Sequence, residues 1–368
     1  MIYLDYNAIT CGFEDILNDA FNVSKKYKFF NPSSVHQAGI DAKNIVLQSR
    51  HEISKALNAR CHDIYFVSGA TEGNNMVLNY RKFDAIFTTA TEHDSILACL
   101  KNKPYHFVKV DENGLIDLED LEYKIKTVNS KNFLCSIMFA NNESGVLQNI
   151  KEISELVKKY KGIMHSDCSQ VFGKINFDFS DFDCLDVITF SGNKIHAGLG
   201  GGCVVCVSGF ELEPLIFGGG QQNYKRGGTE NVLQIFALSK ALSRVISKDY
   251  MLSYQNKVNQ FSNLITKTVF NNNGEIFAFN VSKLPNTFLI KMNNLVNYIQ
   301  MMEFDLNNIC VSIGSACSSG RTEVSHVLKA CNIQEEEAKK YIRVSTGFFN
   351  TLEDIEKFCF VWEELSKR

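Results

Sequence analysis

The stretch Ile64-Tyr65-Phe66-Val67-Ser68-Gly69-Ala70-Thr71-Glu72-Gly73 passes from four apolar residues to a polar, glycine-containing segment. The apolar half predicts a short buried strand, because β-branched and aromatic side chains fit the pleated surface of a sheet. The polar half predicts a tight turn into a helix, whose first backbone N–H groups lack partners within the helix and suit a bound phosphate. Such a turn is more often a plain helix cap, so the motif by itself assigns no phosphate site.

Short apolar segments of the same kind continue to about residue 210 and alternate with helix-like stretches. Residues 150–160 give the clearest helical pattern, with apolar side chains on one face and Lys and Glu on the other. A second helix is expected from Ser33 to about Leu57. This alternation is typical of an α/β domain with a largely parallel sheet. The segments expected as strands are 64–67, 85–88, 106–110, 134–139, 162–165, 187–190 and 203–207.

The composition is that of an ordinary folded protein. Of 368 residues, 45% are hydrophobic and 21% charged, which argues against disorder, collagen-like repeats and coiled coils and suits two domains. The 38 Lys and Arg and 41 Asp and Glu give a net charge of −3, so nucleic acid and anionic membranes are not expected as partners. The 12 cysteines have no repeated spacing, and neither a secretory signal nor a membrane-spanning run is recognisable. A cytoplasmic protein with reduced thiols is therefore expected.

The last third of the chain has a different order of elements. A long helical stretch begins at Val232 and continues toward Phe270, before two segments expected as strands near 275–279 and 287–292. We therefore expect a larger α/β domain over residues 13–250 and a smaller α+β domain over residues 251–368, with residues 1–12 packed on the smaller one. No linker, repeat or charge block marks the boundary, so the long helix alone places it.

Two reactive side chains follow neighbouring strands of the expected sheet. Asp167 comes just after the strand near 162–165, and Lys194 just after the strand near 187–190. The carboxyl ends of parallel strands are where α/β proteins build ligand sites. A lysine, a carboxylate and a phosphate-binding turn are what pyridoxal phosphate (PLP) needs for its Schiff base, its ring nitrogen and its phosphate. Each residue alone is better explained as a surface lysine or an ordinary ion pair, but the three together predict a PLP site.

Cysteines occur in two contrasting settings. Cys317 lies among small residues in Ser312-Ile313-Gly314-Ser315-Ala316-Cys317-Ser318-Ser319-Gly320, which predicts an exposed loop and an accessible thiol that can serve as a nucleophile. Cys203 and Cys206 flank two valines in an apolar segment, and no second Cys or His pair follows at ligand spacing. We therefore predict that both are core residues rather than a redox or zinc pair.

Two histidines and one arginine remain ambiguous from the residues alone. His165 and His196 are predicted to be structural. Arg343 stands within the apolar run Tyr341-Ile342-Arg343-Val344-Ser345, where it is either a solvated edge charge or a forked donor for a carboxylate substrate.

Taken together, these segments resemble the cysteine desulfurases in the NifS/IscS branch of the class V aminotransferase-like PLP enzymes. The resemblance covers nearly the whole chain and rests on ten short patterns in the same order, a combination that is highly specific. The patterns are Tyr3-Leu4-Asp5 with Ala8 and Thr10, Asn31-Pro32-Ser33-Ser34-Val35-His36, Ser68-Gly69-Ala70-Thr71-Glu72, Thr91-Glu92-His93, Asn141-Asn142-Glu143-Ser144-Gly145, Asp167 with Gln170, Ser191-Gly192-Asn193-Lys194, Gly218-Gly219-Gly220-Gln221 with Arg226-Gly227-Gly228-Thr229, Gly314-Ser315-Ala316-Cys317, and Ile342-Arg343.

The resemblance implies the PLP-dependent transferase fold (aminotransferase fold type I), with a mostly parallel seven-stranded sheet in the large domain and a smaller α+β C-terminal domain. It implies that Lys194 forms the Schiff base and that Asp167 pairs with the pyridinium nitrogen. Gln170 would meet the phenolic oxygen of the ring, while His93 would stack on the ring and carry protons. The residues implied to bind PLP are Ala70, Thr71, His93, Asn142, Asp167, Gln170, Ser191, Asn193, Lys194 and Thr229.

Within that set, the backbone of Ala70 and the hydroxyls of Thr71 and Ser191 are implied to hold the phosphate. Thr229 would reach the same phosphate from the second subunit of a homodimer. The substrate carboxylate is implied to bind three residues, Asn31, Asn142 and Arg343.

Cys317 is implied to attack the sulfur of L-cysteine bound to the cofactor, which leaves a persulfide on Cys317 and releases L-alanine. A loop of small residues suits this role, because the persulfide forms in the site and is then presented to an acceptor protein. An iron–sulfur scaffold or another acceptor protein would take the sulfur for cluster assembly, with tRNA thiolation as a second use. The resemblance implies no resident metal, and Cys317 is at most a transient cluster ligand.

Some positions depart from the family pattern. Asn193 stands where the family has histidine before the Schiff-base lysine, which predicts weaker PLP binding, and Phe348 replaces a cation near the substrate entrance. Two alternatives therefore stay open. One is a related PLP lyase or transaminase, such as a selenocysteine lyase, which keeps Lys194 and Asp167 but does not depend on Cys317. The other is a weakly active paralogue that binds a scaffold protein, although such a module needs neither Lys194 nor Cys317.

Overall fold

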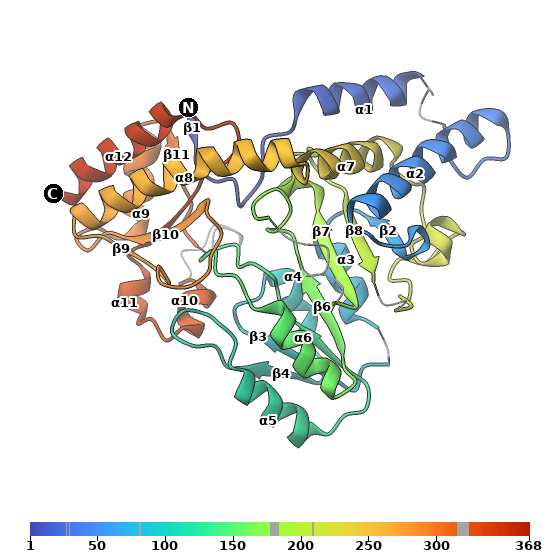
Figure 1. Cartoon of the computed structure of the whole chain (residues 1–368), viewed down its shortest axis with the longest axis horizontal. Coiled ribbons are helices and arrows are strands. Elements are labelled where there is room, and N and C mark those ends of the chain that lie inside the picture. The colour runs from blue at the N-terminus through green and yellow to red at the C-terminus, as the bar shows by residue number, and fades with distance from the viewer. Residues whose placement is uncertain (27, 29, 81, 177–183, 208–209, 315–323) are drawn as a thin grey trace.

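The computed structural model describes residues 1–26, 28, 30–80, 82–176, 184–207, 210–314 and 324–368 (Figure 1). Its strands are β1 (Ile2–Tyr3), β2 (Ile64–Val67), β3 (Ala85–Thr89), β4 (Tyr105–Val108), β5 (Phe133–Ser136), β6 (Ile163–Asp167), β7 (Val187–Ser191), β8 (Gly202–Cys206), β9 (Glu275–Ile276), β10 (Thr287–Lys291), β11 (Ile309–Cys310) and β12 (Tyr341–Ser345).

The helices differ widely in length, and four of those in the described residues are short 3-10 turns. The α-helices are α1 (Glu14–Lys26), α2 (Gln37–Ala56), α3 (Ala70–Leu78), α4 (Asp94–Leu97), α5 (Leu118–Val128), α6 (Ile150–Lys159), α7 (Val232–Val245), α8 (Lys248–Asn271), α9 (Asn297–Leu306), α10 (His326–Ala330), α11 (Glu335–Ala338) and α12 (Leu352–Ser366). The 3-10 turns are η1 (Cys61–Asp63), η2 (Ala98–Leu100), η4 (Gly192–Lys194) and η5 (Gln221–Tyr224). None of the described helices is both long and apolar enough to cross a membrane.

A seven-stranded sheet in the order β2-β8-β7-β6-β5-β3-β4 forms the centre of the molecule. Strands β7, β6, β5, β3 and β4 are parallel, whereas β8 runs antiparallel to both β7 and β2. The predicted mostly parallel seven-stranded sheet is confirmed, and all seven expected segments contribute a strand. The segment expected at 134–139 leaves regular pairing after Ser136, although Ile137 and Phe139 still donate backbone hydrogen bonds to carbonyls of β6.

Both faces of the sheet are buried, as expected where helices cover a parallel sheet on two sides. Successive side chains of β2 pack in two different hydrophobic clusters. Phe66 packs in the cluster that includes α2, α6 and α7, whereas Tyr65 and Val67 pack in the cluster of α3 and α4. Cys203 and Cys206 are both fully buried on β8 and belong to these two different clusters. They therefore point to opposite faces, and the prediction that they are core residues is confirmed.

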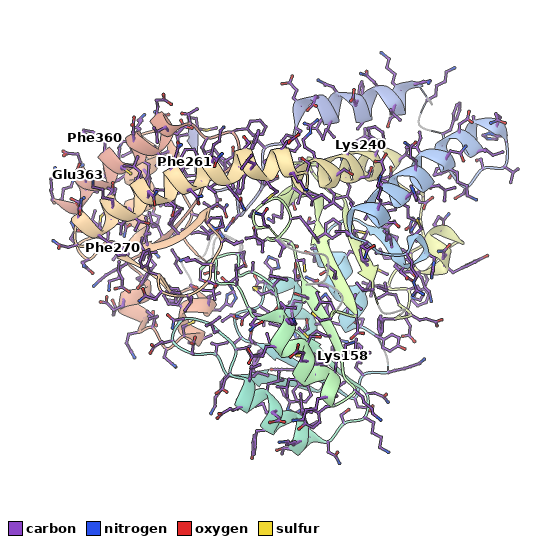
Figure 2. All side chains as sticks on the ribbon, in the orientation of Figure 1. Lys158, Lys240, Phe261, Phe270, Phe360 and Glu363 are labelled. Carbon is purple, nitrogen blue, oxygen red and sulfur yellow. The ribbon has the colours of Figure 1, made fainter. Side chains whose placement is uncertain are left out.

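The C-terminal third forms smaller sheets. Strands β12, β10 and β9 make an antiparallel sheet, and β1 pairs in parallel with β11, so both chain ends lie at the same end of the molecule (Figure 1). The long helical stretch expected from Val232 is two helices, because Ser247 caps the start of α8 with its hydroxyl. Helix α8 buries Phe261 in the core and leaves Phe270 at the surface (Figure 2). Since α8 spans residues 250 and 251, the domain boundary placed there stays a prediction.

Candidate active site

A cavity of about 350 Å³ opens at the carboxyl ends of β6 and β7, beside the N-terminus of α3. These ends meet because β6 and β7 are parallel neighbours in the middle of the sheet, where α/β folds place their ligands. The residues assigned to the site from the sequence that line this cavity are Ala70, Thr71, His93, Asn142, Asp167, Gln170, Ser191, Asn193, Lys194 and Arg343.

The other three assigned residues lie elsewhere. Thr229 lines an adjoining cavity of about 300 Å³, which shares Ser68 and Gly200 with the first. Asn31 is exposed, outside both cavities, and its Oδ1 accepts a hydrogen bond from the backbone of Ser33 at 2.9 Å. Cys317 lies outside the described residues.

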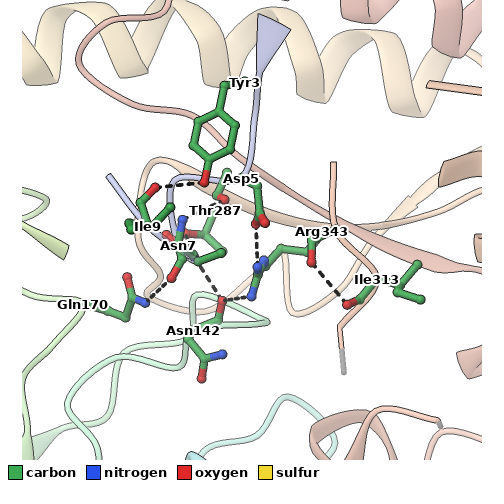
Figure 3. A network of polar contacts seen from close by, with 12 residues as sticks. Tyr3, Asp5, Asn7, Ile9, Asn142, Gln170, Thr287, Ile313 and Arg343 are labelled. Carbon is green, nitrogen blue, oxygen red and sulfur yellow. Dashed lines mark hydrogen bonds and ion pairs between the residues drawn. The ribbon is translucent and has the colours of Figure 1, made fainter. Parts of the chain in front are cut away.

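The described chain that precedes the Cys317 segment passes beside Arg343. Ser312, the start of the small-residue stretch, forms an isolated antiparallel bridge with Arg343. Ile313 lies next to Arg343 (Figure 3). Ser312 and Ile313 therefore lie beside Arg343, whose side chain lines the cavity.

The turn from β2 into α3 presents free backbone donors to the cavity. Gly69 is the N-cap residue of α3, and no side chain caps the helix there. A Cβ at Gly202 would come within 2.6 Å of the Gly69 backbone, so a glycine is required for the strand to approach this closely. The hydroxyl of Ser191 donates to Asn193 Oδ1 at 2.6 Å, which leaves the amide N–H groups of Asn193 unused by this contact. The resulting set of N–H and O–H donors suits an anion.

Asp167 ends β6 with its carboxylate held by two donors. Its Oδ1 accepts from the backbone N–H of Ser169 at 2.9 Å, and its Oδ2 accepts from Asn74 Nδ2 at 2.7 Å. Asn74 is fully buried on α3 and also donates to Ser95 Oγ at 2.8 Å, while Thr189 donates to its Oδ1 at 2.5 Å. The contacts with Ser95 and Thr189 therefore hold the Asn74 amide in the orientation that donates to Asp167.

His93 is held in one tautomer by the same group of residues. It is the N-cap of α4, and its Nδ1 accepts the backbone N–H of Ser95 at 3.1 Å. Because Ser95 Oγ accepts from Asn74, its own proton is free to be donated to His93 Nδ1, 2.9 Å away. Neutral His93 therefore carries its proton on Nε2.

Lys194 is tied to the N-terminal segment. It lies in η4, directly after β7, and its Nζ donates to the carbonyl of Ala8. The carbonyl of the preceding Asn193 accepts from both the backbone and the hydroxyl of Thr10, at 2.9 and 3.0 Å. Residues near the start of the chain thus hold the segment that carries the lysine.

Arg343 projects from β12 into the same cavity and is only 4% exposed. It pairs with Asp5 at 2.6 Å and donates to the carbonyl of Asn142 at 3.1 Å (Figure 3). Its Nε is buried without a hydrogen-bond partner among the described residues. A buried, unused donor on a cation indicates a place for an anionic ligand.

Other buried titratable groups surround the site. His165 and His196 are buried and hydrogen-bonded, as predicted for structural histidines, and burial lowers the pKa of each to about 4. Glu92 precedes His93, and burial raises the pKa of its carboxyl to about 8. Neutral forms of all three are therefore favoured near neutral pH.

Several residues that organise the site were not assigned from the sequence. They are Asp5, Asn7, Asn74, Ser95 and Lys174. Asp5 lies within a pattern that carried the resemblance, which was an available signal. The other four are ordinary polar residues whose importance comes from partners far away in the chain.

The residues present fit pyridoxal phosphate. The donors at the start of α3 match a phosphate, Asp167 matches a protonated ring nitrogen, and Lys194 supplies the amine. All of them face one cavity at the edge of the sheet, as the sequence predicted.

Comparisons with known proteins point the same way. The family model "Aminotransferase class-V" matches residues 2–358. A cysteine desulfurase IscS of Dictyoglomus turgidum is 31% identical over 385 residues, covering 100% of this chain and 95% of the relative. A NifS-like protein from Rickettsia africae has a similar structure, with a TM-score of 0.91 and 38% identity over 100% of both chains. The structure titled "SspA in complex with cysteine" has a TM-score of 0.80 and 27% identity, covering 94% of this chain and 98% of the other.

Proposed function

Because the chain belongs to the class V aminotransferase family, in its cysteine desulfurase branch, we propose that it converts L-cysteine to L-alanine on bound PLP and passes the sulfur to Cys317. The observation that carries the proposal is the single cavity that joins Lys194, Asp167 and the uncapped start of α3. The similar structure whose title names bound cysteine supports L-cysteine as the substrate.

When bound, PLP supplies an electron sink for the α-carbon of the amino acid. Lys194 would hold the cofactor covalently and move the α-proton, since it is the one lysine that lines the cavity within the described part of the chain. Asp167, aimed by Asn74 and Ser169, would keep the ring nitrogen protonated. His93 would offer its Nε2–H as a positioned donor.

Sulfur transfer would then occur between two thiols. The Cys317 sulfur attacks the sulfur of L-cysteine, an S–S bond forms, and the C–S bond of the substrate breaks. The electron pair of that bond stays on the substrate carbon, which takes up a proton, so the products are L-alanine and a Cys317 persulfide. A reducing thiol or an acceptor protein, such as an iron–sulfur scaffold, would remove the outer sulfur.

Arg343 would bind the substrate carboxylate. It is buried beside Lys194 in the cavity wall, and Asp5 and the Asn142 carbonyl fix its guanidinium while leaving Nε unused. A planar fork of N–H donors matches a carboxylate in geometry, which an ammonium does not.

Arg343→Lys is therefore expected to reduce kcat/KM for L-cysteine by about 10- to 100-fold, mainly through a higher KM, because charge-assisted hydrogen bonds contribute about 1.5–3 kcal/mol. Steady-state alanine formation measures both constants. Arg244→Lys is the matched control. Arg244 also donates two hydrogen bonds to a carboxylate, that of Asp15, but it lies on the surface away from the cavity. An unchanged KM in Arg343→Lys would contradict the carboxylate role.

We also propose that the enzyme is a homodimer in which Thr229 of each chain contacts the phosphate in the other. The cavity that contains Thr229 adjoins the first one and is lined by Leu199, and the chain exposes two further large apolar side chains, Phe217 and Tyr224, in the segment before Thr229. Leu199 is 72% exposed, Phe217 73% and Tyr224 76%. Large apolar side chains with this exposure are typical of a surface that another chain covers.

Product analysis tests the proposed function. The purified protein is incubated with L-cysteine and dithiothreitol, and alanine and sulfide are measured together. We expect them in a 1:1 ratio. Sulfide with pyruvate instead of alanine would indicate a different PLP lyase, and neither product from a protein that binds PLP would indicate the scaffold-binding paralogue. A parallel assay with L-selenocysteine distinguishes a selenocysteine lyase.

A further inference from the structure

Lys174 is a buried lysine with no part in the reaction described above. It is 4% exposed, and its ammonium donates to Asn7 Oδ1 at 2.7 Å and to Gln170 Oε1. Both partners are neutral amides. Among the described residues, no carboxylate lies within ion-pair distance of Lys174. The amine is therefore buried without a counter-ion.

The groups around Lys174 do not supply a negative charge either. Burial, together with the nearby cations Lys194 and Arg343, lowers the pKa of Lys174 well below its usual value. The other titratable neighbours share a small cavity with Lys174 and Lys194, and they are Tyr6, His196, Tyr250 and Tyr254. Burial raises the pKa of each of these tyrosines and lowers that of His196 to about 4, so all four are neutral near pH 7.

Lys174 and the Asn7 carbonyl together hold the Gln170 amide in one orientation. Lys174 offers N–H donors, so Gln170 turns its Oε1 toward Lys174 and its Nε2 away. One Nε2 hydrogen is donated to the Asn7 carbonyl at 3.0 Å (Figure 3). The second hydrogen remains available to the cavity, which Gln170 lines.

We propose that Lys174 is a positioning residue: it fixes Gln170 as a hydrogen-bond donor to the phenolic oxygen of PLP, and thereby favours loss of the proton from the Lys194 nitrogen that joins PLP. This inference rests on the proposed function, because it requires PLP on Lys194.

Lys174 affects the pKa of the Lys194 nitrogen through Gln170 and through its own charge, and both effects lower that pKa. A hydrogen bond from Gln170 occupies lone pairs of the phenolic oxygen, which would otherwise stabilise the proton on the neighbouring Lys194 nitrogen. Any positive charge on Lys174 repels that proton as well, since the two side chains line one small cavity. Removing Lys174 is therefore expected to raise the pKa of the Lys194 nitrogen, whatever the charge state of Lys174.

The test is a pH titration of the visible absorption of bound PLP in the full-length holoenzyme. In Lys174→Met, the midpoint of the pH-dependent change in absorption should move to higher pH by about one unit or more. Methionine is close to lysine in size and leaves no buried amine, so the variant is expected to fold. Lys174→Leu provides a second variant without a donor, with the same expected direction.

Two further variants separate positioning from general damage. Lys283→Met is the matched control, because Lys283 also donates to a carbonyl, that of Phe277 at 2.9 Å, but lies outside the cavity. Its titration should equal that of the wild type. Gln170→Leu should shift the transition in the same direction as Lys174→Met. If Lys174 acts through Gln170, the double variant should show less than the sum of the two single shifts.

The outcomes distinguish this inference from the proposed function. A wild-type protein without a visible PLP band would overturn both. A wild type with the band, whose titration is unmoved or lowered by Lys174→Met and Lys174→Leu, would overturn the inference alone. Equal shifts in Lys174→Met and Lys283→Met would also overturn it, because the effect would then follow from losing any buried amine.

Discussion

Lys194→Ala is expected to abolish the yellow colour of the purified protein and to reduce alanine formation from L-cysteine by at least about a thousandfold. Lys194 lies in η4, directly after β7, and lines the cavity, and within the described residues no other lysine lines it. Lys174 lies outside this cavity and is hydrogen-bonded to Asn7 and Gln170, so it is not expected to replace Lys194. An absorption spectrum after dialysis and an alanine assay measure the two losses.

The control for this variant is Lys240→Ala. Lys240 pairs with Glu52 at 2.6 Å on the outside of the molecule, so its removal should leave colour and activity at the wild-type level (Figure 2). If dialysed Lys194→Ala kept the visible band of the wild type, the cofactor would be held by another group, and the assignment of Lys194 would be wrong.

Cys317→Ser is expected to keep the colour, to bind L-cysteine with a change in the absorption spectrum, and to lose sulfide release. The hydroxyl of serine cannot form the S–S bond, so the reaction stops before the substrate C–S bond breaks. Sulfide and alanine, assayed with dithiothreitol, should both fall to background. Ser312, at the start of the small-residue stretch, pairs with Arg343, whose side chain lines the cavity, which supports the assignment.

Cys11→Ser is the control for the thiol. Cys11 is exposed and lies next to the segment that binds Lys194, so it is the accessible described thiol best placed to substitute for Cys317. Wild-type rates in Cys11→Ser together with background rates in Cys317→Ser would assign the persulfide to Cys317. Sulfide release that survives in Cys317→Ser would instead favour the related lyase, which does not depend on that cysteine.

Local sequence patterns were sufficient for much of the fold. The β-rich segments became the seven strands of the central sheet, and the amphipathic pattern at 150–160 became α6. The patterns were less informative about where helices end and where one helix breaks into two. The stretch after Val232 divides at Ser247, because a single serine side chain caps a new helix while the apolar spacing continues across the break.

The candidate site was also largely predictable, for a different reason. Lys194, Asp167 and the turn at Gly69 each follow a strand of one sheet, and the carboxyl ends of parallel strands meet at one edge. Their place in the chain order was therefore enough to bring them together.

The sequence alone thus determined the strands and helices, the parallel sheet and the chemistry at its edge, because these depend on side-chain periodicity and on the order of neighbouring motifs. The tertiary structure alone decided which partners hold the reactive groups. Asp5 and Arg343 are 338 positions apart, and Asn7 and Lys174 are 167 apart. Contacts of this kind form when the ends of the chain fold back on the sheet, and any of many polar residues satisfies the same local pattern. The choice among them depends on the three-dimensional positions of donors and acceptors, which no local spacing encodes.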